Sequence, residues 1–314
     1  LPQLIDLVGP EKVFASPMGV RALNKHFRLE KEIVPVKDGE TLSLGNRTLS
    51  FLETRMIHWP DSMISYLADE KLLFSQDGFG MHLASSERFA DEIPDEVLEW
   101  EAAKYYANIL LPFSPRVLKL LKRVTDLGLE FDIIAPDHGP IWREDPGTIV
   151  GLYADWAVQV PKNKAVIVYD TMWGSTEKMA RALCDGLAQG GTEVKLMKLR
   201  SSHRSDVATE VLDAGALLVG SPTMNNNIFP TVADVLTYLK GLKPQNKIGA
   251  AFGSYGWSGE SVKQVEAVLR EMKVELVSES LKTLYVPGDE ELKRCFELGQ
   301  TVAEKLADQL EDGT

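Results

Sequence analysis

Hydrophobic residues in the second half of the chain form short continuous runs that alternate with amphipathic stretches of helical spacing. The runs predict five strands, at 164–170, 194–199, 216–220, 248–252 and 274–285. The amphipathic stretches predict five helices, at 177–189, 207–214, 232–242, 261–272 and 290–310. Strands that alternate with helices pair in parallel, and strands that are apolar on both faces lie inside a covered sheet. We therefore expect an α/β domain over residues 161–314, a doubly wound, five-stranded parallel sheet.

The first half of the chain has shorter apolar segments, and several of them are grouped in pairs. Residues 40–54 predict two strands around the turn dipeptide Gly45-Asn46, and 63–67 with 71–74 predict a second pair. The other expected elements are strands at 12–15 and 131–135 and helices at 19–27, 95–109 and 115–127. Antiparallel pairs mixed with helices indicate an α+β domain over residues 1–160, which ends at the polar segment around Pro161.

Composition and charge exclude several classes of protein. The chain of 314 residues is 44% hydrophobic and 25% charged, as in globular proteins, and its length suits two domains. Its 34 Lys and Arg against 46 Asp and Glu give a net charge of −12, which repels nucleic-acid phosphates. No apolar run is long enough to span a bilayer, no signal-peptide pattern is present, and two cysteines, Cys184 and Cys295, make no disulfide framework. We expect a cytoplasmic protein that binds neither nucleic acid nor membrane.

The loop after the first strand of the second domain has the composition of a phosphate site. Ligands of parallel sheets bind beyond the carboxyl ends of the strands. This loop offers hydroxyls, a glycine and the start of a helix, and consists of Thr171, Met172, Trp173, Gly174, Ser175 and Thr176. It has neither a lysine nor the glycine-lysine pattern of nucleoside-triphosphate loops, so we expect a phosphomonoester.

The loops after the third and fourth strands suit a planar polar ring. One is rich in amides: Ser221, Pro222, Thr223, Met224, Asn225, Asn226 and Asn227. The other combines aromatic rings with glycines: Ser254, Tyr255, Gly256, Trp257, Ser258 and Gly259. Each loop by itself is more typical of an ordinary turn, cap or surface segment. Together, at three strand ends, they predict FMN, and the chain from residue 164 onward resembles flavodoxins.

Two imidazoles and a carboxylate stand at expected strand ends in the first domain. They are His58, Asp77 and His138, with 18 residues between the first two and 60 between the last two. Such groups can ligate one or two metal ions, and the two oxygens of Asp77 allow it to bridge a pair. A single histidine near a strand end is more often structural, so the metal hypothesis depends on all three residues.

The whole chain resembles the flavodiiron proteins, in which a metallo-β-lactamase-like domain precedes a flavodoxin-like domain. The resemblance is carried by His-Trp-Pro-Asp-Ser (58–62), Asp-Gly-Phe-Gly (77–80), Asp-His-Gly-Pro (137–140) and the loops at 221–226 and 254–259. It implies that Asp77 bridges two irons, with His58 on one and His138 on the other. It also implies that Tyr106 lies near the metals as a catalytic residue.

The same resemblance implies a function and partners. The family reduces O2 to water, NO to nitrous oxide, or both, and FMN relays electrons from a small donor protein such as rubredoxin. It also implies a head-to-tail homodimer. Members carry a His-x-Glu-x-Asp-His cluster near the N-terminus, which these 314 residues lack. We therefore expect the metal domain here to be partial, with the remaining iron ligands on a segment outside this sequence.

Two other functions are compatible with the residues. The first is an FMN electron-transfer module whose metal domain is inactive or structural, which about two irons per chain would exclude. The second is a metal-dependent hydrolase of the β-lactamase-like class with a flavodoxin appendage, which zinc and cleavage of esters or thioesters would indicate. The sequence leaves the choice between O2 and NO open, and also the identity of the donor.

Overall fold

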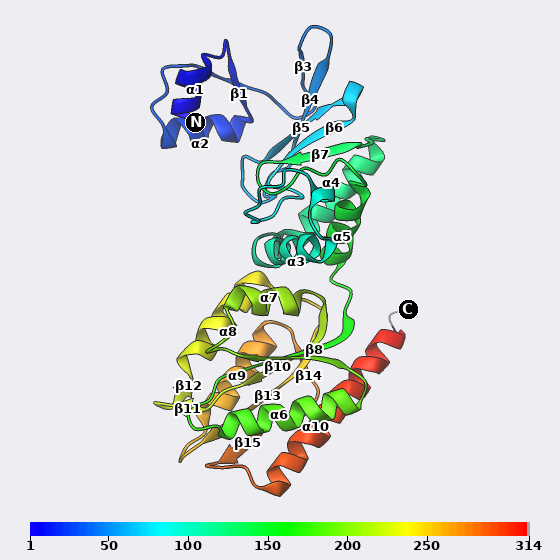
Figure 1. The fold of residues 1–314 in the computed structure, drawn as a ribbon. Coiled ribbons are helices and arrows are strands. Elements are labelled where there is room, and N and C mark those ends of the chain that lie inside the picture. Colours follow the sequence, from blue (N-terminus) through cyan, green and yellow to red (C-terminus); the bar gives the residue numbers. More distant parts are fainter. Residues whose placement is uncertain (313–314) are drawn as a thin grey trace. The chain divides into compact units, whose positions relative to one another are not determined.

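The structure, a computed structural model, describes residues 1–312 and divides the chain into two compact units (Figure 1). The first unit is Leu1–Ala157, and the second begins at Val158. Each unit has a main sheet of its own. Among the described residues, no helix combines the length and the apolar character that crossing a membrane requires.

The second unit is a parallel sheet covered by helices on both faces. Its strands run in the order β14-β13-β10-β8-β9, with β15 also paired to β13. Their bounds are β8 (Lys162–Tyr169), β9 (Glu193–Lys198), β10 (Ala214–Gly220), β13 (Ile248–Tyr255), β14 (Glu275–Leu276) and β15 (Leu281–Leu284). The predicted doubly wound fold is confirmed. The expected fifth strand is divided into β14 and β15, because the polar residues Ser278, Glu279 and Ser280 interrupt its apolar pattern.

Five helices cover this sheet, and they are α6 (Ser175–Gln189), α7 (Arg204–Asp213), α8 (Pro230–Leu242), α9 (Glu260–Glu271) and α10 (Asp289–Asp312). α6 and α10 lie together on one face, and α7, α8 and α9 cover the other (Figure 1). Gly186 of α6 allows the first pair to touch backbone to backbone, since a Cβ there would lie 2.1 Å from the Phe296 carbonyl oxygen of α10. The buried strands between these layers form the core of the unit.

The first unit contains a mixed five-stranded sheet in the order β3-β4-β5-β6-β7. Neighbouring strands are antiparallel except β6 and β7, which are parallel. The bounds are β3 (Thr41–Ser43), β4 (Thr48–Glu53), β5 (Met63–Leu67), β6 (Leu72–Gln76) and β7 (Ile133–Pro136). Both predicted strand pairs are therefore present, and the α+β architecture is confirmed. A separate parallel pair joins β1 (Val13–Ala15) to β2 (Ile33–Pro35).

The helices of the first unit include two that the hydrophobic pattern did not predict, α1 and α5. The bounds are α1 (Pro2–Val8), α2 (Pro17–His26), α3 (Asp95–Tyr105), α4 (Ser114–Asp126) and α5 (Gly147–Val158). α5 was missed because its glycines and β-branched residues have weak helix propensity. Its stability comes instead from burial of Ile149, Tyr153 and Trp156 in the core.

A partly buried ion-pair network lies at the amino end of the second sheet. Lys164 Nζ lies 2.7 Å from Glu210 Oε2 and 2.8 Å from Asp213 Oδ1, and Lys162 Nζ lies 2.9 Å from Asp213 Oδ2. Burial by itself raises the pKa of the Asp213 carboxyl. The hydrogen bonds and positive charges of Lys164 and Lys162 outweigh burial and leave that pKa below its ordinary value.

This network predicts a stability loss that depends on pH. Asp213→Asn should lower the free energy of unfolding at pH 7 by about 1–3 kcal/mol, because Lys164 loses a charged partner. Since the pKa of Asp213 is lower in the folded than in the unfolded chain, its contribution is present above about pH 4 and is lost as the pH falls through the folded pKa. Urea unfolding at pH 7, 5 and 3.5 would check this, with the exposed Asp308→Asn as control. An equal loss at all three pH values would contradict it.

Candidate metal and flavin sites

Three loops of the first unit bring His58, Asp77 and His138 together. Asp77 directly follows β6, His138 follows the parallel neighbour β7, and His58 lies in the turn between β4 and β5. His58 Nε2 lies 3.4 Å from Asp77 Oδ2, and His138 Nε2 lies 3.2 Å from Asp77 Oδ1. One imidazole thus faces each oxygen of a single, largely buried carboxylate.

Backbone contacts orient His138 toward that carboxylate. Its Nδ1 lies 3.3 Å from the Met81 carbonyl oxygen, which favours a proton on Nδ1 and leaves Nε2 free to bind a metal. The loop can approach this closely because Gly139 has a φ of +86°, and a Cβ there would lie 2.9 Å from the Met81 nitrogen. The Met81 carbonyl therefore holds the ring of His138 through Nδ1 in an orientation that directs Nε2 toward Asp77.

Two further side chains lie beside His138 and were not assigned from the sequence. The ring of His82 is 5.0 Å from that of His138, and the Tyr105 hydroxyl lies 3.5 Å from His138 Nε2. Burial lowers the pKa of His82, and the neighbouring His138 lowers it further. Burial also raises the pKa of Tyr105, and the charges of Asp77 and Asp137 add to this, so its hydroxyl keeps its proton.

The structure places Tyr105, and not Tyr106, at this site. The Tyr106 hydroxyl is 3.0 Å from Ser114 Oγ, and its ring packs against Tyr153 and Trp156 in the core. Consecutive residues of a helix point about 100° apart, so only one of the two tyrosines can face His138. α3 also ends at Tyr105 and continues as a π-helical turn, Tyr106–Leu110, a feature that is frequent at functional sites.

These donors fit part of a diiron ligand set. One nitrogen of each imidazole and the two oxygens of Asp77 can serve two neighbouring metals, one on each side of the carboxylate. In the part of the chain that the structure describes, no three His, Cys, Asp or Glu side chains converge on a single metal position. His58, Asp77 and His138 therefore fit as part of a ligand set and do not close a metal site by themselves.

The predicted phosphate loop lies between β8 and α6. Gly174 has a φ of +88°, and its N–H donates to Thr171 Oγ1 at 3.0 Å. Ser175 and Thr176 open α6, whose amino end favours an anion. Thr176 Oγ1 lies 2.9 Å from Ser254 Oγ, which joins this loop to the carboxyl end of β13. Ser254 and Tyr255, expected in the loop after the fourth strand, are the last two residues of that strand.

The amide-rich loop after β10 is a small hairpin of β11 (Thr223–Met224) and β12 (Asn227–Ile228). Asn225 and Asn226 form its tip with φ of +50° and +60°, as a tight hairpin turn requires. Asn226 Oδ1 accepts a hydrogen bond of 3.4 Å from Ser258, and the Thr223 and Ser261 hydroxyls are 2.8 Å apart. The second and third loops are therefore joined as well, and all three lie at one end of the sheet.

Large apolar side chains on these loops are exposed. Trp173 is 92% exposed and Trp257 83%, and Met172 and Met224 are also exposed. Isolated exposed residues are common, but a group of this size at one sheet end is typical of a surface that a ligand or a partner covers. A planar ring system between these loops would cover part of it.

One residue that holds the phosphate loop was missed. Asp170 is fully buried, and its Oδ1 accepts the Thr171 N–H at 2.7 Å. The Thr231 hydroxyl donates to Oδ2 at 2.6 Å, and Arg200 Nε lies 3.2 Å from Oδ1. The sequence did contain an indication, since a carboxylate that directly follows an apolar strand is rarely buried without partners.

Comparisons with known proteins agree with the fold of both halves of the chain. A model described as ODP family beta lactamase matches residues 1–139, and the flavodoxin model matches residues 167–299. The chain is 49% identical over 309 residues to a nitric oxide reductase of Moorella thermoacetica and 48% identical over 309 residues to a rubredoxin-oxygen oxidoreductase of Megalodesulfovibrio gigas. Each match covers 98% of this chain and 77% of the relative.

Solved structures give the same result. The structure of the rubredoxin oxygen:oxidoreductase from Desulfovibrio gigas has a TM-score of 0.96 at 47% identity, over 98% of this chain and 78% of that one. The flavodiiron protein from Giardia intestinalis has a TM-score of 0.92 at 34% identity, over 95% and 74%. The expected order of a metallo-β-lactamase-like domain followed by a flavodoxin-like domain is confirmed.

Proposed function

The chain belongs to the flavodiiron proteins, and on that premise we propose that it is an oxidoreductase that reduces O2 to water, NO to nitrous oxide, or both, with FMN relaying the electrons. The observation that carries the proposal is the Asp77 carboxylate, which has an imidazole on each oxygen. One relative is named a nitric oxide reductase and another a rubredoxin-oxygen oxidoreductase, and each is identical to this chain at nearly half of the aligned residues.

In this proposal His58 and His138 would each hold one iron, and Asp77, which faces both imidazoles, would contribute its two carboxylate oxygens. When bound, the iron pair supplies electrons and the coordination positions at which a diatomic substrate is reduced. Further ligands are needed beyond those that residues 1–312 bring together. The Met81 carbonyl keeps His138 oriented, and the Tyr105 hydroxyl, which keeps its proton and lies 3.5 Å from His138 Nε2, would be available to donate a hydrogen bond to a substrate there.

FMN belongs at the three joined loops of the second unit. The hydroxyls and amides of the loop between β8 and α6 would bind its phosphate, and the exposed aromatic residues Trp173 and Trp257 would cover its ring. The donor is a small redox protein, and rubredoxin is the first candidate because a relative is named for it. The exposed apolar surface at this end is compatible with a second copy of the chain, and we propose the head-to-tail homodimer that the resemblance to flavodiiron proteins implies. We also propose that the protein acts in the cytoplasm.

One alternative is favoured by a specific observation. Since the described residues do not close a metal site, the chain could serve as an FMN electron-transfer module with an inactive or structural metal domain. The iron content distinguishes these two functions, because about two irons per chain supports the O2 or NO reductase and an iron-free flavoprotein supports the electron-transfer module. Bound zinc together with cleavage of esters or thioesters would instead indicate a metal-dependent hydrolase of the β-lactamase-like class.

The experiment is a reconstitution of the purified protein with ferrous iron and FMN under argon. Iron and flavin are quantified per chain, and consumption of O2 and of NO is followed electrochemically with reduced rubredoxin as donor. The proposal predicts bound flavin, bound iron and consumption of at least one gas. A protein that binds both cofactors and consumes neither gas would refute it.

The placement of the tyrosines gives a prediction with a matched control. Tyr105→Phe should retain iron and lower kcat by roughly 10-fold or more, because it removes a hydroxyl that can donate to substrate without removing a ligand. Tyr106→Phe removes a hydroxyl of the same kind from the core and should leave kcat unchanged. Equal kcat values for the two variants would contradict the assignment.

A further inference from the structure

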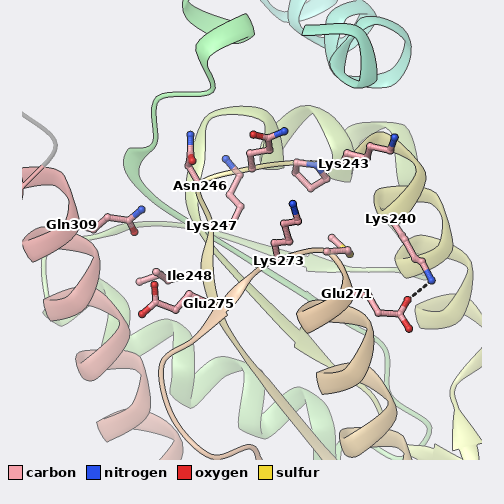
Figure 2. Close-up of a pocket in the computed structure, with 12 residues that line it drawn as sticks. Lys240, Lys243, Asn246, Lys247, Ile248, Glu271, Lys273, Glu275 and Gln309 are labelled. Atoms are coloured by element: carbon pink, nitrogen blue, oxygen red, sulfur yellow. Dashed lines mark hydrogen bonds and ion pairs between the residues drawn. The ribbon is translucent and has the colours of Figure 1, made fainter. Parts of the chain in front are cut away.

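A cavity of about 740 Å³ opens at the end of the second sheet opposite the flavin loops. It is lined by the segment between α8 and β13, by the turn after α9 and by the end of α10 (Figure 2). Ile248, the first residue of β13, lines it, whereas the flavin loop follows the last residue of that strand. The cavity therefore belongs to neither site described above.

The lining is rich in positive charge although the protein carries a net charge of −12. Four lysines line it, against the two carboxylates of Glu271 and Glu275. Lys240 is ion-paired with Glu271 and turns toward it (Figure 2). Among the described residues, the other three have no carboxylate partner: Lys243, Lys247 and Lys273. Lys243 and Lys273 are exposed and Lys247 is buried, and an anion in the cavity would be attracted by all three charges.

Lys247 is the most unusual of the three because it is buried. The side chain is 3% exposed, and the only acceptor for its ammonium group within the described chain is the Leu212 carbonyl at 3.4 Å. This hydrogen bond caps the carboxyl end of α7. It uses only one of the three N–H groups of the Lys247 ammonium, and its length is at the upper limit for a hydrogen bond. Burial lowers the pKa of Lys247 to about 8, so the group still carries its charge at neutral pH. A buried cation with two protons unsatisfied is destabilising unless an anion approaches it.

A second polar group of the lining is also unsatisfied. Gln309 Oε1, on α10, is buried and has no hydrogen-bond partner among the residues that the structure describes. Lys247 and Lys273 extend into the same space, and Gln309 faces it from the other side (Figure 2). The lining therefore offers cationic donors on one wall and an amide on the opposite wall.

From these observations we infer that the cavity is a binding site for a small aliphatic polyanion, a phosphate ester or a polycarboxylate. Lys243, Lys247 and Lys273 bind its charges, and Gln309 bonds a hydroxyl or a protonated oxygen of the same molecule. The residues that line the cavity include no aromatic ring, so there is no surface on which a nucleobase could stack. They include no arginine either, so recognition is by point charges, as is usual for lysine.

The test is calorimetric titration of the full-length, FMN-loaded protein with two probes, fructose 1,6-bisphosphate and tricarballylate, in 150 mM NaCl. We expect saturable binding of one probe per chain for at least one of them, and the probe that binds more tightly distinguishes phosphate ester from polycarboxylate. If neither probe binds saturably, or if both bind weakly and equally with the salt dependence of a diffuse charged surface, the inference is overturned.

Substitutions assign the binding to the cavity. Lys247→Met replaces the buried ammonium by an apolar chain of similar length, so the protein should fold, which its FMN content and melting temperature would verify. It should weaken binding at least tenfold, and the exposed Lys273→Met should weaken it by a smaller factor. Lys293→Met removes the same charge near the start of α10, about 24 Å along the helix from Gln309, and should change nothing. Equal weakening in all three variants would show that the probe binds elsewhere.

Discussion

Asp77→Asn should abolish iron binding and lower O2 and NO reduction by roughly 10³-fold or more, the effect of losing several kcal/mol of metal stabilisation. Asp77 faces both His58 and His138, so a single substitution affects both proposed iron positions. Asparagine has the same shape but no charge, and only one of its two terminal atoms can bind a metal. The fold should therefore be retained while the shared carboxylate is lost.

The measurement is iron per chain by elemental analysis, together with rates of O2 and NO consumption. Asp69→Asn is the control, since Asp69 is an exposed aspartate in the turn between β5 and β6. FMN content should be the same in both variants because the flavin loops lie in the other unit. Iron content and rates in Asp77→Asn equal to those of the control would remove the basis of the proposed metal site.

Asp170→Asn should weaken FMN binding by roughly 5- to 150-fold, which corresponds to about 1–3 kcal/mol for a buried charged hydrogen bond. The carboxylate receives the Thr171 N–H, the Thr231 hydroxyl and Arg200 from three different elements. An asparagine would direct an N–H₂ group toward one of these donors. The phosphate loop would then lose the contact that fixes its first residue beside the proposed phosphate position.

Riboflavin separates this effect from general instability, because it has the same ring without the phosphate. Flavin-free protein is titrated with FMN and with riboflavin while flavin fluorescence is followed, and the exposed Asp185→Asn serves as control. Asp170→Asn should lower the affinity for FMN and leave the affinity for riboflavin nearly unchanged. Equal weakening of both would assign Asp170 a role in overall folding, and no weakening would exclude it from flavin binding. A wild-type protein that binds neither flavin would instead refute the proposed function.

The two domains differ in how far their elements could be predicted. In the second, buried strands appear as continuous apolar runs, so periodicity identified them and failed only where Ser278, Glu279 and Ser280 divide the last one. In the first, α5 has a sequence with weak helix propensity and is stabilised by burying Tyr153 and Trp156. The local sequence pattern of α5 does not show this burial, because Tyr153 and Trp156 pack against residues far away along the chain, such as Phe79 and Tyr106.

Residue types and their spacing were enough to propose candidates for chemistry: the imidazoles and carboxylate of the first domain, and the three loops of the second. Which of these residues meet could be seen only in the folded chain. There Tyr105 lies beside His138 and Tyr106 beside Ser114, Asp170 is paired with Arg200, and the buried Lys247 donates to the Leu212 carbonyl. Residue type and spacing fix local conformation and reactivity, whereas a contact across the chain depends on how separate strands and helices pack.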